Sequence, residues 1–309
     1  MSGKPPAATR ENARLGVFAG LAAYLIWGLV PVFFKQIAEV PAGEIIAHRV
    51  VWAMVLMTAV TGFGRGFGDA RQIARMPAQL AKIALASALV IINWLTFVWG
   101  VNNGHILETS LGYFILPLFN VALGVLVLKE RLRPLQWLAV LLAAIGVAIE
   151  AARAGGLPWI ALVLAGTFGI YGLLRKQLPL DAVSGLFLET VCMTPLALVW
   201  LAWLTLSGQN HFGAGPGLLS GRDLMLIATG AVTAIPLLLF AIAARRMPLT
   251  MMGFLQYLAP SITFLLAVFV YDEPLDLSRT LGFGAIWTGL AVYSVDLVRS
   301  ANAKKVVSP

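Results

Sequence analysis

Ionisable side chains are scarce in this sequence. Only 12% of the residues are Asp, Glu, Lys or Arg, whereas 60% are hydrophobic and the mean hydropathy is +0.87. An ordinary soluble domain carries about 25% charged residues. The scarcity of charge excludes a soluble globular protein and predicts an integral membrane protein.

Cysteine and histidine are nearly absent. The single cysteine, Cys192, lies in an apolar segment, so the sequence offers no disulfide framework and no thiolate metal site. With only three histidines in the chain, no metal-ligand cluster, paired carboxylates or nucleophile-base spacing stands out. We therefore expect no enzyme, no metal and no cofactor.

A cleavable leader is not expected either. Residues 1–14 are polar and basic, and the apolar segment after them has no A-x-A cleavage signal. We expect a cytoplasmic tail over 1–14, followed by a first span that stays in the protein.

Long apolar segments are what the sequence has in abundance. A helix needs about 20 apolar residues to cross the hydrocarbon core. The ten segments of this kind are 15–35, 43–62, 82–101, 106–128, 134–151, 157–175, 183–206, 223–244, 249–271 and 277–297. They predict an all-α integral membrane protein of ten transmembrane helices, with the glycine-rich connection 62–77 as a flexible loop.

The basic residues indicate the orientation. Of the 22 Lys and Arg residues, 17 fall on one side of the ten spans, four fall on the other, and Arg49 lies within the second span. Since cytoplasmic loops carry the excess of Lys and Arg, both termini, including the tail 299–309, are expected in the cytoplasm. The net charge of +8 is spread over many loops and predicts no nucleic-acid partner.

The chain contains an internal repeat. A shift of 143 residues aligns Pro117 with Pro260, Glu130 with Glu273 and Gly146 with Gly289. Each unit holds five spans, an odd number, so the second unit must be inverted in the membrane. We expect repeats over 15–151 and 152–298.

Inverted repeats favour a transporter that works by alternating access, with its solute near the repeat interface. The alternative is a duplication that only enlarged a stable bundle. Pro117 and Pro260 each remove a backbone hydrogen bond within a span, as hinges or as simple bends. Small residues at 16–20 and 282–289 indicate close helix packing, within one chain or between two, so the oligomeric state stays open.

The segment EIIAHR places three ionisable groups at the start of the second span. Glu44 is expected at the membrane interface, with His48 and Arg49 deeper in the core. Arg49 either extends to the interface or pairs with a buried partner, for which Glu108 is the best candidate. His48 is a candidate for proton coupling or, alternatively, a neutral hydrogen-bonding residue. Glu189, in the seventh span, is expected to form a separate site in the inner half.

Neutral polar and aromatic residues complete the candidates. Asn93, beside Trp94 and near Trp99, either joins two helices or recognises a small amphipathic ligand. Tyr113 and Tyr257, with Trp27 and Tyr171, either line the cavity that would hold this ligand or pack as ordinary aromatics. The carboxylates of Glu130, Glu273 and Asp276 are expected to cap helix N-termini near them.

The sequence resembles the EamA repeat of the drug/metabolite transporter superfamily. Within it, AYLIWGLVPVFFK, EIIAHR, NWLTFVWGVNNGHILETSLGYFILPL and KERLRPLQWLAV are similar to the RarD-type subgroup. The subgroup commonly has Asn in GYFINPL where this chain has Leu116. The resemblance implies a carrier of the bacterial inner membrane, in a superfamily that includes exporters of amino acids and other small metabolites.

The sequence thus predicts a secondary transporter that exports a small amphipathic solute, with membrane lipid as its surroundings. A lipid or lipid-precursor flippase and a non-transporting membrane scaffold are the alternatives. Whether Arg49 faces lipid or a cavity distinguishes the flippase from the solute transporter.

Overall fold

The protein is described from a computed structural model, which covers residues 7–63, 66–103, 105–152, 159–215, 219–270 and 277–306. In these ranges the chain is helical and has no strand. The helices are α1 (Ala7–Lys35), α2 (Ala42–Phe63), α3 (Gly66–Ala74), α4 (Pro77–Asn102), α5 (Ile106–Leu126), α6 (Pro134–Ala152), α7 (Trp159–Gln177), α8 (Ala182–Leu206), α9 (Gly221–Arg246), α10 (Leu249–Gln256), α11 (Leu258–Phe269) and α12 (Leu277–Val306).

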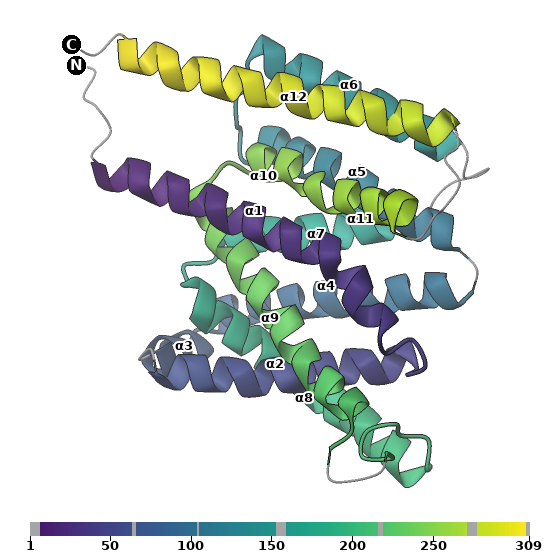
Figure 1. Ribbon diagram of the computed structural model, residues 1–309. Helices are drawn as coiled ribbons and strands as arrows, with labels where there is room; N and C mark the ends of the chain where they lie inside the picture. Colours follow the sequence, from purple (N-terminus) through teal and green to yellow (C-terminus); the bar gives the residue numbers. More distant parts are fainter. Residues whose placement is uncertain are drawn as a thin grey trace.

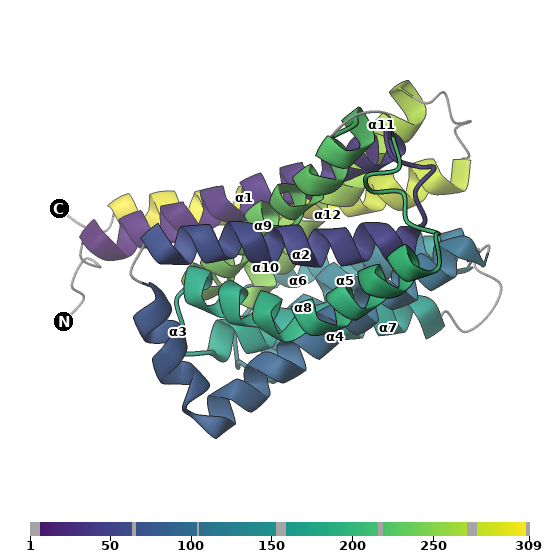
Figure 2. The same ribbon diagram turned by 90° about the horizontal axis from the view of Figure 1, so that it is seen from below.

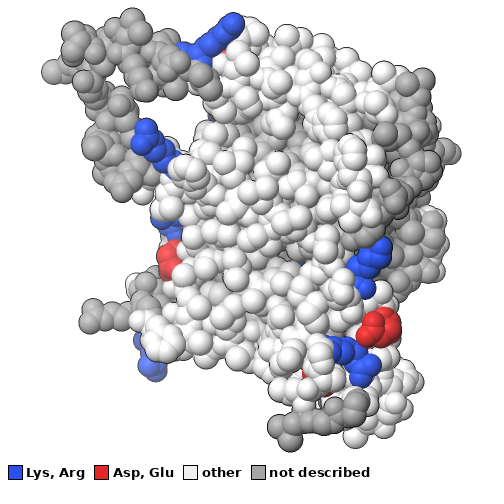
Figure 3. Space-filling view, viewed as in Figure 1, with Lys and Arg blue, Asp and Glu red and all other residues white. Residues whose placement is uncertain are grey.

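Within the described ranges, eight helical segments are long and apolar enough to cross a membrane. Two shorter apolar helices accompany them, at Leu111–Leu126 and Pro134–Ile149. The middle of the face in Figure 3 is free of charge, and its Lys, Arg, Asp and Glu side chains lie toward the edges. The chain is therefore a multi-pass membrane protein, as its composition predicts.

One expectation about the helices was wrong, and three helices differ from the expected spans in extent or continuity. The connection 62–77 contains the helix α3 instead of a flexible loop, and α1 begins at Ala7, inside the expected tail. The last helix likewise continues to Val306. The expected span 249–271 is two helices, α10 and α11, which meet at Tyr257. Pro260, three residues after the break, has no N–H to donate to the carbonyl of Gln256, and its ring crowds that carbonyl.

The start of α1 and the end of α12 lie at the same end of the bundle (Figures 1 and 2). The described ends of α1 and α12 lie at the left in Figures 1 and 2, on the same side as α3. The connection between α8 and α9 lies at the opposite end. This placement agrees with an even number of crossings.

Packing between helices joins segments far apart in the sequence. Helix α6 packs on α12, α2 on α8 and α5 on α10, while α1 lies against α9 and α4 against α7. The largest cluster of buried residues includes Tyr24, Tyr171 and Phe240. Large apolar side chains such as Leu25, Leu141 and Val199 remain exposed, which suits a surface that faces lipid.

Glycines bring α6 and α12 together at two places. A Cβ on Gly146 would lie 2.6 Å from the carbonyl oxygen of Gly282, and a Cβ on Gly289 would lie 2.8 Å from that of Ala139. Only glycine permits this approach of the two backbones. The predicted small-residue seam of the last span is thus an intramolecular contact at Gly282 and Gly289, whereas Gly284 faces open space.

Candidate functional site

Arg49 points into the helix bundle and is held by side chains from three other helices. Its Nε donates to Oγ1 of Thr233 on α9 at 2.9 Å. Its guanidinium carbon lies 4.4 Å from the ring centroid of Trp94 on α4 and 5.3 Å from that of Phe34 on α1. Such cation–π contacts stabilise a guanidinium by about 0.5–2 kcal/mol, more when water is excluded.

The expected partner of Arg49, Glu108, has a side chain outside the described residues, so that pairing stays a prediction. Among the described side chains, no carboxylate lies within ion-pair distance of Arg49. Tyr113 of α5 lies close enough to interact electrostatically with Arg49, and its ring contacts that of Phe97 at 5.8 Å between centroids. The structure thus brings Arg49 together with Phe34, Trp94 and Thr233, which are called the Arg49 cluster below. Sequence reasoning missed Phe34 and Thr233.

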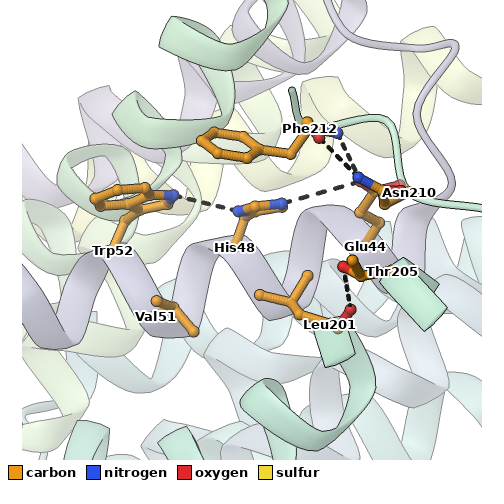
Figure 4. Close-up of a pocket in the computed structure, with 8 residues that line it drawn as sticks. All are labelled: Glu44, His48, Val51, Trp52, Leu201, Thr205, Asn210 and Phe212. Atoms are coloured by element: carbon orange, nitrogen blue, oxygen red, sulfur yellow. Dashed lines mark hydrogen bonds and ion pairs between the residues drawn. The ribbon is translucent and has the colours of Figure 1, made fainter. Parts of the chain in front are cut away.

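His48 lines a cavity of about 250 Å³ near the connection between α8 and α9 (Figure 4). The remaining lining residues are Glu44, Val51, Trp52, Leu201, Thr205, Asn210 and Phe212. The Nε1–H of Trp52 donates to Nδ1 of His48 at 3.2 Å. An indole nitrogen only donates, so Nδ1 must accept and the proton of the neutral imidazole is on Nε2.

The Nε2 atom of His48 has no hydrogen-bond partner in this structure although it is buried. The nearest carboxylate oxygen, Oε1 of Glu44, is 3.9 Å away, too far for a hydrogen bond. Phe212 packs on the imidazole with 4.9 Å between ring centroids. The buried Nε2–H is therefore a donor available to a small ligand or a water molecule in the cavity.

Glu44 is buried at the start of α2, whereas its expected depth, at the membrane interface, stays a prediction. Its side chain accepts from the backbone N–H of His211 at 2.7 Å, from that of Phe212 at 3.2 Å, and from Nδ1 of His211 at 2.8 Å. The residue is 1% exposed because the connection after α8 folds back over the start of α2. A carboxylate so deeply buried requires these three donors.

Glu189 has its own partners, separate from Arg49. Its Oε1 accepts from Nη1 of Arg175 at 3.0 Å, and its Oε2 accepts from the Tyr171 hydroxyl at 3.1 Å. Arg175 also donates to the carbonyl of Ala182. Both charged side chains are 2% exposed. Arg175 is thus a buried residue in the last turn of α7.

Asn93 joins two helices. Its Nδ2 donates to the carbonyl oxygen of Leu164 and to Oγ1 of Thr167, both at 2.9 Å on α7. These two bonds use both donors of the amide. Trp99 stacks on His105 at 5.5 Å between centroids and also contacts Trp159, whereas the rings on Arg49 are those of Phe34 and Trp94.

Tyr257 and the two candidate hinges lie where α5 meets α10 and α11. The Tyr257 hydroxyl donates to the carbonyl of Phe114 at 3.3 Å. A Cβ on Gly253 would lie 2.5 Å from the carbonyl oxygen of Pro117, so the chain packs closely beside that proline. Pro117 lies within the unbroken α5, whereas Pro260 follows the break at Tyr257.

Glu130 caps a helix in the other half of the chain. Its carboxylate accepts from the backbone N–H groups of Leu249 and Thr250 at 2.8 and 2.9 Å, at the start of α10. Capping was expected, but near Glu130 in the sequence instead of across the bundle. The other two predicted capping residues, Glu273 and Asp276, lie outside the described residues.

No group of three or more His, Cys, Asp or Glu residues in the described part of the chain is arranged to hold a metal ion.

Comparison with known proteins identifies similar chains. The model of the EamA-like transporter family matches residues 14–150 and, a second time, residues 157–295. A relative from Pseudomonas aeruginosa, "Uncharacterized transporter PA0485", is 48% identical over 94% of this chain and 96% of its own. "Protein RarD" of Escherichia coli is 42% identical over 93% of this chain and 96% of its own.

A solved crystal structure of a protein 20% identical to this one has the same fold, with a TM-score of 0.66. The match covers 91% of this chain and 97% of that chain.

Proposed function

Because this chain belongs to the EamA-like transporter family, in the group of proteins named RarD, we propose that it is a secondary transporter. It moves a small amphipathic solute, of the amino-acid kind, out of the cell across the bacterial inner membrane. Drugs of similar size and polarity are further candidates. Both termini lie in the cytoplasm, as the distribution of Lys and Arg indicates.

Alternating access between two inverted repeats is the proposed mechanism. Support comes from the two family matches, which cover 14–150 and 157–295. Further support comes from the glycine contacts of α6 and α12. Gly146 approaches Gly282 while Gly289 approaches Ala139, and residues 146 and 289, like 139 and 282, are related by the 143-residue shift. A two-fold axis produces such reciprocal pairs.

Other central contacts support the same proposed axis. The Tyr257 hydroxyl bonds to the carbonyl of Phe114, and these residues are also 143 positions apart. The pairs α2 with α8 and α5 with α10 each join one helix to its counterpart in the other half. In a bundle of this symmetry, exchanging the conformations of the two halves opens the opposite side of the membrane.

The environment of Arg49 carries the proposal for the solute. Its guanidinium lies over the Trp94 and Phe34 rings, and its described hydrogen bond uses only Nε. The outer nitrogens of a guanidinium bind a carboxylate with two hydrogen bonds. We assign the solute's carboxylate to Arg49, and its apolar part to the rings of Trp94, Phe34 and Tyr113.

The interior position of Arg49 favours a solute over a lipid as the cargo. Phe34, Thr233 and Trp94 approach it from three helices, so the guanidinium faces the bundle. A flippase requires a head-group site that opens sideways to lipid.

A thermal-shift screen of purified protein tests the proposal. Amino acids, their amides, nucleosides, drugs and lipid precursors are added to wild type, Arg49→Gln and the control Arg71→Gln, which changes an exposed arginine of α3. We expect stabilisation by a carboxylate-bearing solute in the wild type and the control, lost in Arg49→Gln. Stabilisation by a lipid precursor alone would support the flippase instead.

A further inference from the structure

A second cavity lies at the end of the bundle where α1 begins and α9 ends, and it shares no lining residue with the Arg49 cluster. Its volume is about 450 Å³. Arg14, Val17 and Phe18 of α1 line one side, and Arg246, Met247 and Met251 line the other. No part of the proposed solute site uses these residues.

The two walls are held at a fixed separation. A Cβ on Gly16 would lie 2.7 Å from Cβ of Arg246, so α1 passes directly over the last turn of α9. Lys176 holds the connection to α10, because its Nζ donates to the carbonyl oxygens of Ala244 and Met247. This second cavity, called the groove below, is therefore formed by the packing of the fold and does not result from a loose helix end.

The rim of the groove carries positive charge that is not neutralised. Arg14 and Arg246 are exposed, and neither has an ion-pair partner among the described side chains. Arg246 donates to the carbonyl of Ile242 through Nη1 at 3.3 Å, which leaves the other guanidinium nitrogens free of described protein partners. Its neighbour Arg245 adds a further positive charge beside it.

The floor of the groove and the adjoining helix surface are apolar. Val17, Met247 and Met251 form the floor. Phe18 is 69% exposed and Leu15 is 49% exposed on the same stretch of α1. An apolar groove with two arginines at its mouth matches a molecule that has a phosphate at one end and a hydrocarbon chain at the other.

We propose that this groove binds an anionic phospholipid of the cytoplasmic leaflet. The phosphate lies between Arg14 and Arg246, and an acyl chain follows Val17, Phe18 and Met251. The lipid joins α1 to the connection between α9 and α10 and is retained instead of transported. This inference does not depend on which solute the Arg49 cluster binds.

Native mass spectrometry of the full chain in detergent tests the proposal. Phosphatidylglycerol and phosphatidylcholine with identical acyl chains are titrated against the wild type and against Arg14→Gln/Arg246→Gln. The matched control, Arg71→Gln/Arg75→Gln, removes the same charge from exposed positions outside the groove. Each basic residue near an anionic lipid contributes about 1 kcal/mol, and 1.4 kcal/mol is tenfold in affinity.

We expect the groove variant to bind phosphatidylglycerol about ten- to thirty-fold more weakly than the wild type, while the control changes by less than about two-fold. Phosphatidylcholine should bind the wild type weakly. Equal losses of phosphatidylglycerol affinity in both double variants, or no loss of affinity in the groove variant, would overturn the proposal.

Two further experiments identify the molecule that occupies the groove. Glycerol phosphate, which has the phosphate without the chains, should fail to displace the lipid; displacement at similar concentration would mean a soluble-anion site and would overturn the proposal. Proteoliposomes carrying fluorescent phosphatidylglycerol should show no protein-dependent movement between leaflets. Protein-dependent movement that the groove variant abolishes would make the lipid a cargo and would also contradict the proposal.

Discussion

Trp52 donates its indole N–H to Nδ1 of His48, one turn earlier on the same helix, at 3.2 Å. The bond assigns the imidazole proton to Nε2. Protonation of Nδ1 would require this bond to break. In this conformation His48 is therefore a neutral donor to the cavity, and a proton-coupling role requires a conformation in which Trp52 has moved.

Nuclear magnetic resonance of protein labelled with ¹⁵N-histidine checks the tautomer. We expect the wild type near neutral pH to show a protonated Nε2 and an unprotonated Nδ1 for His48. Trp52→Phe removes the donor and should give a mixture of tautomers. The resonance is assigned with His48→Gln. A wild-type His48 protonated at Nδ1 would exclude the Trp52 bond.

The buried Glu44 carboxylate should fix the connection after α8 onto α2. Glu44→Ala leaves the backbone N–H groups of His211 and Phe212 without their acceptor. A buried donor without a partner costs about 1–3 kcal/mol. We expect this loss of stability in thermal unfolding, with faster amide exchange over 207–215.

The matched control for Glu44→Ala is Gln209→Ala, because Gln209 is an exposed residue of the same connection. Gln209→Ala should leave thermal unfolding and the amide exchange over 207–215 near their wild-type values. Equal amide exchange over 207–215 in Glu44→Ala and the wild type would mean that Glu44 does not hold the connection.

Gly185 should be essential for the ion pair between Arg175 and Glu189. A Cβ at Gly185 would occupy the place of the Arg175 guanidinium. Breaking a buried ion pair costs about 3–5 kcal/mol, so Gly185→Ala should lower the unfolding temperature clearly. Gly166→Ala is the control, because no atom lies within 4 Å of its Cβ position. It should be neutral or slightly stabilising, since alanine is the better helix former.

Two more variants complete this test. Glu189→Gln keeps the size of the side chain and should destabilise the protein, because Arg175 would remain buried without its counter-charge. If Gly185→Ala and Gly166→Ala were equally stable, Arg175 would have to adopt another position without loss.

Asp181 should make the start of α8 sensitive to acid. Partial burial alone would raise the pKa of this carboxyl, but hydrogen bonds from Ser184 and Val183 and the charge of Arg245 hold the pKa below its usual value. Its contribution to stability is thus present above the unfolded-state pKa of about 3.9 and is lost as pH falls through the lower folded-state value.

Asp181→Ala should cost about 1 kcal/mol, as loss of an N-cap does. Unfolding measured between pH 7 and pH 3 should show the wild type approaching Asp181→Ala as the pH falls. A difference that stays constant to pH 3 would mean that the charge of the cap contributes nothing.

Much of the fold could be predicted from apolar segments alone, because a helix that crosses a membrane must be about 20 residues of nearly continuous hydrocarbon. The division of the ninth apolar segment into α10 and α11 could not be predicted, because proline bends some helices and interrupts others. Pro117 lies within a continuous α5 and Pro260 follows a break. The surrounding packing decides between the two results.

The candidate site was predictable only in its central residues. A charge in an apolar segment indicates Arg49 and Glu189, but Thr233 is 184 residues from Arg49 in the sequence, and nothing in the pattern joins them. The burial of Glu44 was not predictable, because its position along α2 says nothing of the connection after α8 that folds back over it. Glu130 was expected as a cap, yet its helix, α10, lies in the other half of the chain.

Exchange of solute across proteoliposomes tests the central claim most directly. Vesicles with wild type, Arg49→Gln or Arg71→Gln are loaded with the solute found by the thermal-shift screen, and the uptake of labelled solute against this internal pool is followed. Uptake of the carboxylate-bearing solute should be rapid with wild type and Arg71→Gln, and at least ten-fold slower with Arg49→Gln, since a charge-assisted hydrogen bond contributes about 1.5–3 kcal/mol. Equal uptake with Arg49→Gln and the wild type would contradict the assignment of the solute's carboxylate to Arg49.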